Sequence, residues 1–304
     1  MKNSIGMPSQ NLHYQYVLLA LFSQQTLTKS ASGFVAYCVD TVTLFHEQYL
    51  GIGVGANQST AIAFHWSQGA ALLNSKLSCA IEPSERDALW ACAAMLGALV
   101  FSSIQAKTPE EAWPLWSSPS DLDWLTLCEG KKEIWKITNP MRKDSVFHSI
   151  IPNFLASPSA CSNTDLRKLP PELIELCRLD DIPLQEDNPY LEPAYFLAQM
   201  INMQCNGQTV GMFLSFFGCI SSNYKQLLKQ KDSCAILLLA YWYAKMATYR
   251  QWWVSRRAVL ECQAICKYLR LYHGHDNNIL QALKFPETTC AAQSIIGRPI
   301  LLEW

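Results

Sequence analysis

The sequence has little charge and almost no charge imbalance. Only 16% of its 304 residues are Asp, Glu, Lys or Arg, and together they leave a formal net charge of −1. Proteins that attract nucleic acid or an anionic membrane by general electrostatics carry a basic face or a basic run. We therefore expect no direct nucleic-acid binding. Half of the residues are hydrophobic, so the chain is long and apolar enough to bury a sizeable core.

Apolar runs of membrane-spanning length are also missing. Residues 88–106 and 193–224 contain no formally charged side chain, but a spanning helix needs about 20 predominantly apolar residues. Ser102 and Ser103 dilute the end of the first stretch, and the polar residues of 202–208 interrupt the second. We expect buried core helices here and no membrane span.

Closely spaced cysteines are lacking, although the chain contains twelve. They are scattered through apolar stretches, and the N-terminal apolar run, Tyr16–Phe22, is short and has no cleavage site typical of a secretory signal. We interpret that run as a first helix and the thiols as reduced, in an intracellular protein of the nucleus or cytoplasm. Cys262 and Cys266 lie one helical turn apart without further ligands nearby, so we expect buried thiols, no metal site and no cofactor.

Strand-like alternation is scarce, and helix signals dominate. Ser84 with Asp87, and Ser120 with Asp123, are typical of capping boxes in front of apolar helices. Asn188-Pro189 predicts the start of a helix over 190–205. We predict an all-α fold, with one large multi-helix domain over residues 1–304 and long irregular loops.

Two stretches depart from the helical pattern. Residues 138–169 are rich in Pro, Ser and Asn and predict a long surface loop. Residues 31–58 combine β-branched residues with glycines and are interpreted as an insertion, in which 42–49 could form a strand. The glycines of Gly51–Asn57 superficially resemble a dinucleotide loop, but no βαβ alternation follows them, which favours a flexible loop.

Three blocks of sequence resemble the regulatory domain of a known family. The first block, His65–Ser103, contains Leu72-Leu73-Asn74 and Asp87-Ala88-Leu89. The second, Thr108–Trp135, contains Pro-Glu-Glu-Ala-Trp and Asp-Leu-Asp-Trp-Leu. In the third, Cys234–Tyr272, the residues Tyr249-Arg250-Gln251-Trp252-Trp253 join an apolar helix to a basic one. In this order they resemble the regulatory domain of fungal binuclear-zinc transcription factors, notably those similar to sterol uptake control proteins. The resemblance spans residues 12–253, with gaps.

The DNA-binding module of that family is absent from these residues. A binuclear zinc cluster needs six closely spaced thiolates, and Cys262 with Cys266 is the closest pair. The resemblance therefore implies a regulatory domain without its zinc cluster. We expect Trp252, Trp253 and the arginines at 256 and 257 to hold the helix corner against a neighbouring helix.

Aromatic and methionine side chains gather on the apolar helices. Such residues either fill an ordinary core or line a pocket for a rigid apolar ligand. The resemblance implies a hydrophobic small molecule of the sterol or terpenoid kind as partner, whose binding would change homodimerisation or a regulatory surface. The predicted ligand-binding residues are Trp90, Met95, Phe101, Phe213, Phe217, Leu238, Tyr241, Trp242, Met246 and Trp252.

Two other functions stay open at this point. An enzyme on the same scaffold could cyclise or isomerise a terpenoid or polyketide-like substrate, with His65, Asp121 or Asp123 as the acid. A protein-interaction module that dimerises is the other. The cluster His273-Gly274-His275-Asp276 carries two imidazoles and a carboxylate, but the glycine indicates a loop at the end of a helix.

Overall fold

The computed structural model describes residues 33–52, 56–118, 121–148, 166–180, 188–218 and 220–296. Within these ranges every regular element is a helix, which confirms the all-α prediction. The α-helices are α3 (Gly33–Tyr49), α4 (Ala56–Leu77), α5 (Arg86–Ser102), α6 (Asp123–Thr138), α7 (Pro171–Leu176), α8 (Leu191–Met200), α9 (Val210–Ser215), α10 (Ser222–Lys229), α11 (Ser233–Ala247), α12 (Trp252–His273), α13 (Asn277–Ala282) and α14 (Lys284–Ile296). Short 3-10 turns include Pro83–Glu85, Pro109–Glu111, Leu166–Lys168 and Phe216–Gly218.

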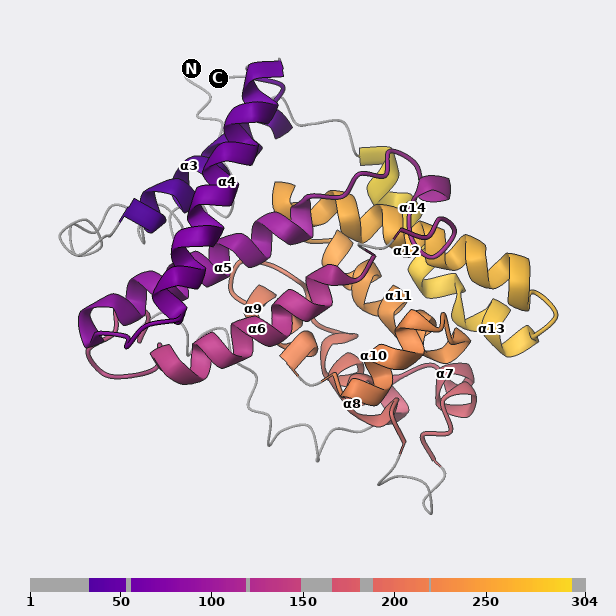
Figure 1. Ribbon diagram of the computed structural model, residues 1–304. Helices are drawn as coiled ribbons and strands as arrows, with labels where there is room; N and C mark the ends of the chain where they lie inside the picture. Colours follow the sequence, from indigo (N-terminus) through magenta and orange to yellow (C-terminus); the bar gives the residue numbers. More distant parts are fainter. Residues whose placement is uncertain are drawn as a thin grey trace, which may run out of the picture.

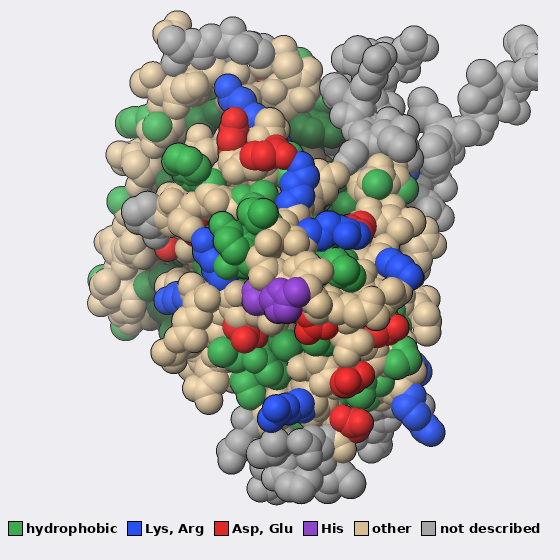
Figure 2. Space-filling view, turned by 90° about the vertical axis from the view of Figure 1, so that its right-hand side faces the viewer, with side chains coloured by type: hydrophobic (Ala, Val, Ile, Leu, Met, Phe, Trp, Pro, Cys, Tyr) green, Lys and Arg blue, Asp and Glu red, His purple; other side chains and the backbone are tan. Residues whose placement is uncertain are grey.

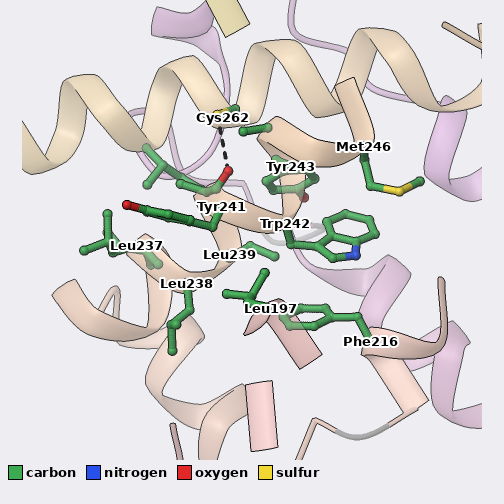
Figure 3. Packing of buried hydrophobic residues seen from close by; sticks show 14 of the residues in the cluster. Leu197, Phe216, Leu237, Leu238, Leu239, Tyr241, Trp242, Tyr243, Met246 and Cys262 are labelled. Carbon is green, nitrogen blue, oxygen red and sulfur yellow. Dashed lines mark hydrogen bonds between the residues drawn. The ribbon is translucent and has the colours of Figure 1, made fainter. Parts of the chain in front are cut away.

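Helix α11 forms the centre of the larger core. Every residue from Ala235 to Ala244 is fully buried, as expected for a helix that is hydrophobic on all sides. Asp232 caps its N-terminus by accepting a hydrogen bond from the Ala235 backbone N–H at 2.9 Å. Helices α8, α12 and α14 pack against it. Figure 3 shows the side chains of α11 pointing to opposite sides, with Tyr241 and Trp242 diverging below Cys262 of α12.

Helices α3 and α4 form an antiparallel pair at the other end of the molecule (Figure 1). Helix α5 reaches from this pair to α12 and contacts both. A second hydrophobic cluster lies where α3 meets α5, around Phe34, Cys38 and Met95. The molecule thus has one large core around α11 and a smaller one under the α3–α4 pair.

The structure corrects the prediction of a strand at residues 42–49, because α3 covers this stretch. Phe34, Cys38 and Thr41 follow a helical period and are buried on one face. The hydroxyl of Thr41 donates to the Tyr37 carbonyl at 2.7 Å, which satisfies its polar atom inside the helix. Tertiary burial of one helical face therefore outweighs the strand preference of the β-branched residues. Glycine is needed only after the helix, where Gly51 has a φ of 72°.

The capping box predicted at Ser84 and Asp87 is also wrong. Helix α5 has Glu85 at its N-cap without a side-chain cap bond. The Asp87 carboxylate instead accepts hydrogen bonds from Arg142, from the Ser145 hydroxyl and from the Val146 N–H, at 2.7, 2.7 and 3.0 Å.

These bonds tie part of the predicted 138–169 loop to the start of α5. Residues 139–148 are irregular, as predicted, but Ser145 and Phe147 are buried, and Phe147 packs into the smaller cluster. Residues 149–165 lie outside the described ranges, as do the predicted first helix at Tyr16–Phe22 and the cap residue Ser120.

Two further boundaries differ from the predictions. The helix predicted over 190–205 ends at Met200, where α8 gives way to turns. Asn188 accepts a hydrogen bond from the Tyr190 N–H at 2.9 Å just before the helix, but the N-cap of α8 is Tyr190, so the prediction of Asn188 as the cap is wrong. None of the helices that the structure describes is both long and apolar enough to cross a membrane.

Candidate functional site

An aromatic cluster fills the region between α5, α6, α9 and α11. Its members are the rings of Phe101, Trp124, Phe216, Phe217, Trp242 and Tyr243, and all are buried. Phe217 and Trp242 have ring centroids 4.4 Å apart, and Trp124 and Phe217 have centroids 4.7 Å apart, both edge to face. Edge-to-face pairs at such distances stabilise the cluster beyond simple burial.

Trp242 is held in this cluster by its polar edge as well as by its ring. Its Nε1–H donates to the Phe213 carbonyl at 2.7 Å. Phe216 stacks on it with an interplanar angle of 16°, and its place next to Trp242 can be followed in Figure 3. Because its donor is bonded and Phe216 stacks on its ring, Trp242 is fixed in position.

A buried ion pair on α12 borders the aromatic cluster. Arg257 and Glu261 are one helical turn apart, with side chains 10% and 5% exposed, and they form a salt bridge. The Tyr243 hydroxyl donates to the second carboxylate oxygen of Glu261. Arg257 also donates from Nε to the Phe101 carbonyl at 2.6 Å and lies over the Phe101 ring at 5.4 Å. The charges are thus paired and hydrogen-bonded, as buried charges must be.

Electrostatics at this ion pair are dominated by burial. Burial raises the pKa of the Glu261 carboxyl, and Arg257 opposes that rise. Burial likewise raises the pKa of the Tyr243 phenol, with the Glu261 charge acting in the same direction. The tyrosine is therefore a stable hydrogen-bond donor at neutral pH, and Glu261 is a carboxyl whose ionisation is opposed by its surroundings.

The indole N–H of Trp124 stands out within the cluster. The residue is 3% exposed, and its Nε1 has no hydrogen-bond partner in the part of the chain that the structure describes. Buried indole N–H groups normally find an acceptor. Trp124 therefore offers an unused donor in the middle of an apolar, aromatic environment, next to Phe101 and Phe217.

The ten predicted ligand-binding residues fall into two groups. Phe101, Phe213, Phe217, Leu238, Tyr241, Trp242 and Met246 belong to the large core, and Trp252 packs partly buried at its edge. Trp90 and Met95 lie in the smaller cluster instead, where Trp90 meets Trp135 edge to face at 4.8 Å. Eight of the ten thus share the large core, but Tyr241 and Trp242 point to opposite sides of α11, so the eight do not all line one site.

The three candidate acids do not converge on one point. His65 lies on α4, and its Nδ1 is 3.2 Å from the Asp40 carboxylate of α3. Asp123 is exposed at the start of α6. Asp121 accepts a hydrogen bond from the Ser118 N–H, and burial raises the pKa of its carboxyl. Asp121 alone is close enough to the buried ion pair to share electrostatic interactions with Arg257 and Glu261.

The predictions for the two arginines of the helix corner and for the histidine cluster are confirmed. Arg256 donates to the Ala106 carbonyl at 3.0 Å, and Arg257 donates to the Phe101 carbonyl, so both arginines join α12 to the end of α5. The histidine cluster is a loop, since α12 ends at His273 and Asp276 caps α13. Among the described residues, no group of three or more His, Cys, Asp or Glu side chains could hold a metal ion.

Sequence reasoning missed Glu261, Tyr243 and Trp124 as parts of the site. A signal for the ion pair was present, because Arg257 and Glu261 are four residues apart on a helix whose other inner positions are apolar. Nothing in the sequence indicates that the Trp124 indole lacks an acceptor, since that depends on which backbone groups surround it.

Comparison of the chain with protein-family models, with curated proteins and with solved structures finds no match.

Proposed function

We propose that this chain is an intracellular regulatory domain, nuclear or cytoplasmic, that binds a hydrophobic small molecule of the sterol or terpenoid class and has no DNA-binding module in these residues. We assign its binding site to the aromatic cluster around Trp124, whose rings pack against one another and would have to move apart to admit the ligand. The observation that carries this proposal is the unused indole N–H of Trp124 inside the aromatic cluster.

The chemistry of the cluster suits such a ligand. Flat aromatic faces and apolar side chains complement a rigid fused-ring skeleton, while a single polar group fixes its orientation. Burying about 300 Å² of apolar ligand surface at ~25 cal/mol per Å² contributes roughly 7 kcal/mol before ordering costs are subtracted. The Trp124 donor would then pair with one oxygen of the ligand, a hydroxyl or a ketone.

Homodimerisation is part of the same proposal. Helix α4 leaves Phe64 52% and Leu72 37% exposed, two turns apart along one face. Over its 22 residues, α4 carries Lys76 as its one Lys, Arg, Asp or Glu. In an isologous contact the same residues face each other, so a face without like charges can meet its own copy without repulsion. A second copy of this chain is therefore the occupant that we assign to the α4 face.

The test of ligand binding uses the indole nitrogen. Trp124→Phe keeps a ring in the cluster but removes the donor, so affinity for ergosterol should fall by about tenfold, the effect of one hydrogen bond of ~1.4 kcal/mol. Affinity for a sterol hydrocarbon without the oxygen should stay unchanged. Binding is measured by fluorescence titration and thermal shift, and mass spectrometry of organic extracts identifies what co-purifies.

Trp90→Phe is the matched control, because Trp90 lies in the other hydrophobic cluster. It should bind both sterols like the parent. Equal affinity of the Trp124→Phe protein and the parent for ergosterol would contradict the assignment of this site, and a parent protein whose melting ignores all sterols and terpenoids would contradict the function itself.

A further inference from the structure

The thiols of Cys177 and Cys234 meet between two helices. Cys177 ends α7, and Cys234 lies in the first turn of α11. The Cys234 thiol donates to the Leu176 carbonyl at 3.2 Å. This carbonyl belongs to the peptide bond between Leu176 and Cys177. Each of the two side chains also shifts the pKa of the other thiol. Two thiols from separate parts of the sequence are therefore neighbours at the junction of α7 and α11.

The two thiols have unequal surroundings. Cys177 is fully buried, whereas Cys234 is partly exposed. Cys234 also sits at the N-terminus of a 15-residue helix, where the helix dipole favours a thiolate. The Cys177 side chain lowers the pKa of the Cys234 thiol, whereas burial and then the charge of Asp232 oppose this, and the pKa of the Cys177 thiol is raised. Cys234 thus has the properties of an attacking thiol, and Cys177 those of a resolving one.

Other neighbouring thiols in the described residues lack a member that is partly exposed. Cys38 contacts Cys92 between α3 and α5, but both are fully buried within their helices. Cys262 lies beside Cys266 on α12 and beside Cys290 of α14, and all three are buried. A small oxidant from solvent can reach Cys234 without opening the core, whereas the members of these other groups are shielded.

We propose that Cys234 and Cys177 form an oxidisable dithiol that a hydroperoxide converts into a disulfide. The Cys234 thiolate attacks the peroxide and breaks the O–O bond, which gives a sulfenic acid on Cys234 and releases hydroxide. The Cys177 sulfur then attacks the Cys234 sulfur, the S–S bond forms and the sulfenic oxygen leaves as water. In total, two thiols and one hydrogen peroxide give one disulfide and two waters, with two electrons passing from the sulfurs to the peroxide.

The disulfide would join the end of α7 to the start of the central helix. Asp232, the cap of α11, is also bonded to the Tyr190 hydroxyl at 2.9 Å, just before α8. A covalent link at Cys234 therefore acts at the point where α7, α8 and α11 meet. It would change how α11 packs in the large core.

The experiment treats the full chain with hydrogen peroxide, blocks free thiols under denaturing conditions and maps disulfides by mass spectrometry. A peptide pair joining Cys177 and Cys234 should appear first and should revert with dithiothreitol. In Cys177→Ser the resolving thiol is missing, so Cys234 should accumulate as a sulfenic acid that dimedone labels. Far-UV circular dichroism of the reduced variants checks that they are folded.

Cys38→Ser is the matched control, because it removes a contacting but shielded thiol. It should form the 177–234 disulfide at the parent's rate. Cys79 is exposed, so its oxidation indicates that the peroxide attacks thiols without selectivity. The proposal is overturned if Cys79 or the Cys38–Cys92 pair oxidises while Cys177 and Cys234 are recovered as free thiols, or if dimedone fails to label Cys234 in folded Cys177→Ser.

Discussion

At the scale of single residues, Glu261 shows how much of this core depends on polar contacts. Its carboxylate lies between Arg257 and Tyr243, far from solvent. A buried ion pair adds little stability by itself, because desolvation offsets the attraction between its charges, but leaving one member unpaired is costly. The pair also fixes α12 against α5, since Arg257 donates to the Phe101 carbonyl.

We expect the pH dependence of stability to report on Glu261. Burial raises the pKa of its carboxyl, so the unfolded chain ionises at lower pH than the folded one. The free energy of unfolding must then fall as pH rises from the ordinary pKa of glutamate through the raised pKa. Glu261→Gln cannot ionise, so over that range its free energy of unfolding should rise relative to that of the parent. The relative rise is about 1.4 kcal/mol for each tenfold difference in proton affinity between the folded and the unfolded parent. Urea denaturation from about pH 4 to pH 8 measures this.

Tyr243→Phe is the control for this measurement. It removes the hydroxyl that stabilises the Glu261 carboxylate and leaves the carboxyl ionisable. Its stability should fall with pH at least as steeply as that of the parent. A Glu261→Gln protein whose pH profile parallels the parent's would contradict a raised pKa at this position.

Single residues of the site were only partly predictable. The aromatic side chains of α11 could be assigned to the core because every position from Ala235 to Ala244 is apolar, and Arg257 could be assigned to the helix corner. The Trp124 donor and the partner of Tyr243 could not, since hydrogen bonding between distant segments depends on the tertiary arrangement and leaves no periodic pattern.

At the scale of elements, the loop after α6 is anchored more firmly than its composition suggests. Three of its hydrogen bonds lead to one carboxylate, that of Asp87 at the start of α5. The prediction of a capping box failed because the same carboxylate has better partners outside the helix. Helix positions were predicted well where a long continuous apolar run follows a polar turn, as in α11, and poorly where β-branched residues suggested a strand, as in α3.

Asp87→Ala should destabilise the protein by about 3–5 kcal/mol, the cost of leaving a largely buried partner charge unpaired. Arg142, Ser145 and the Val146 N–H would lose their shared acceptor. Asp144→Ala is the control, because Asp144 bonds the same arginine from a side chain that is 76% exposed. It should cost less than about 1 kcal/mol. Urea denaturation of both variants decides the matter, and equal losses would show that the Asp87 contacts do not anchor the loop.

At the scale of the whole molecule, the two hydrophobic clusters divide the surface as well as the interior. The face opposite the α3–α4 pair mixes acidic, basic and apolar side chains, with histidine among them, and shows no field of one sign (Figure 2). The low net charge predicted this absence of an extended basic patch on that face. The exposed apolar residues of α4 could not be predicted, because the same amphipathic sequence would also suit a covered helix.

Phe64→Glu should weaken the proposed dimer by at least about tenfold, because an isologous contact brings the two new charges together in a desolvated place. Sedimentation equilibrium over a concentration series measures the dissociation constant. Leu271→Glu, on the exposed surface of α12, is the control and should leave it unchanged. A parent chain that stays monomeric at high concentration would contradict the dimer, and it would leave the ligand site unaffected.

The burial of α11 on every side has a consequence for the synthesis of the chain. Helices α12 and α14, which cover it, follow it in sequence and end at Ile296, 49 residues after Ala247 (296 − 247). At about 5–20 residues per second, roughly 2–10 s pass before the ribosome has produced its cover. During that interval the nascent chain presents a 15-residue apolar helix with Lys245 as its one charged side chain. Such a segment is a natural binding site for chaperones, so the helix that stabilises the finished domain most is also the one that needs protection while the domain is made.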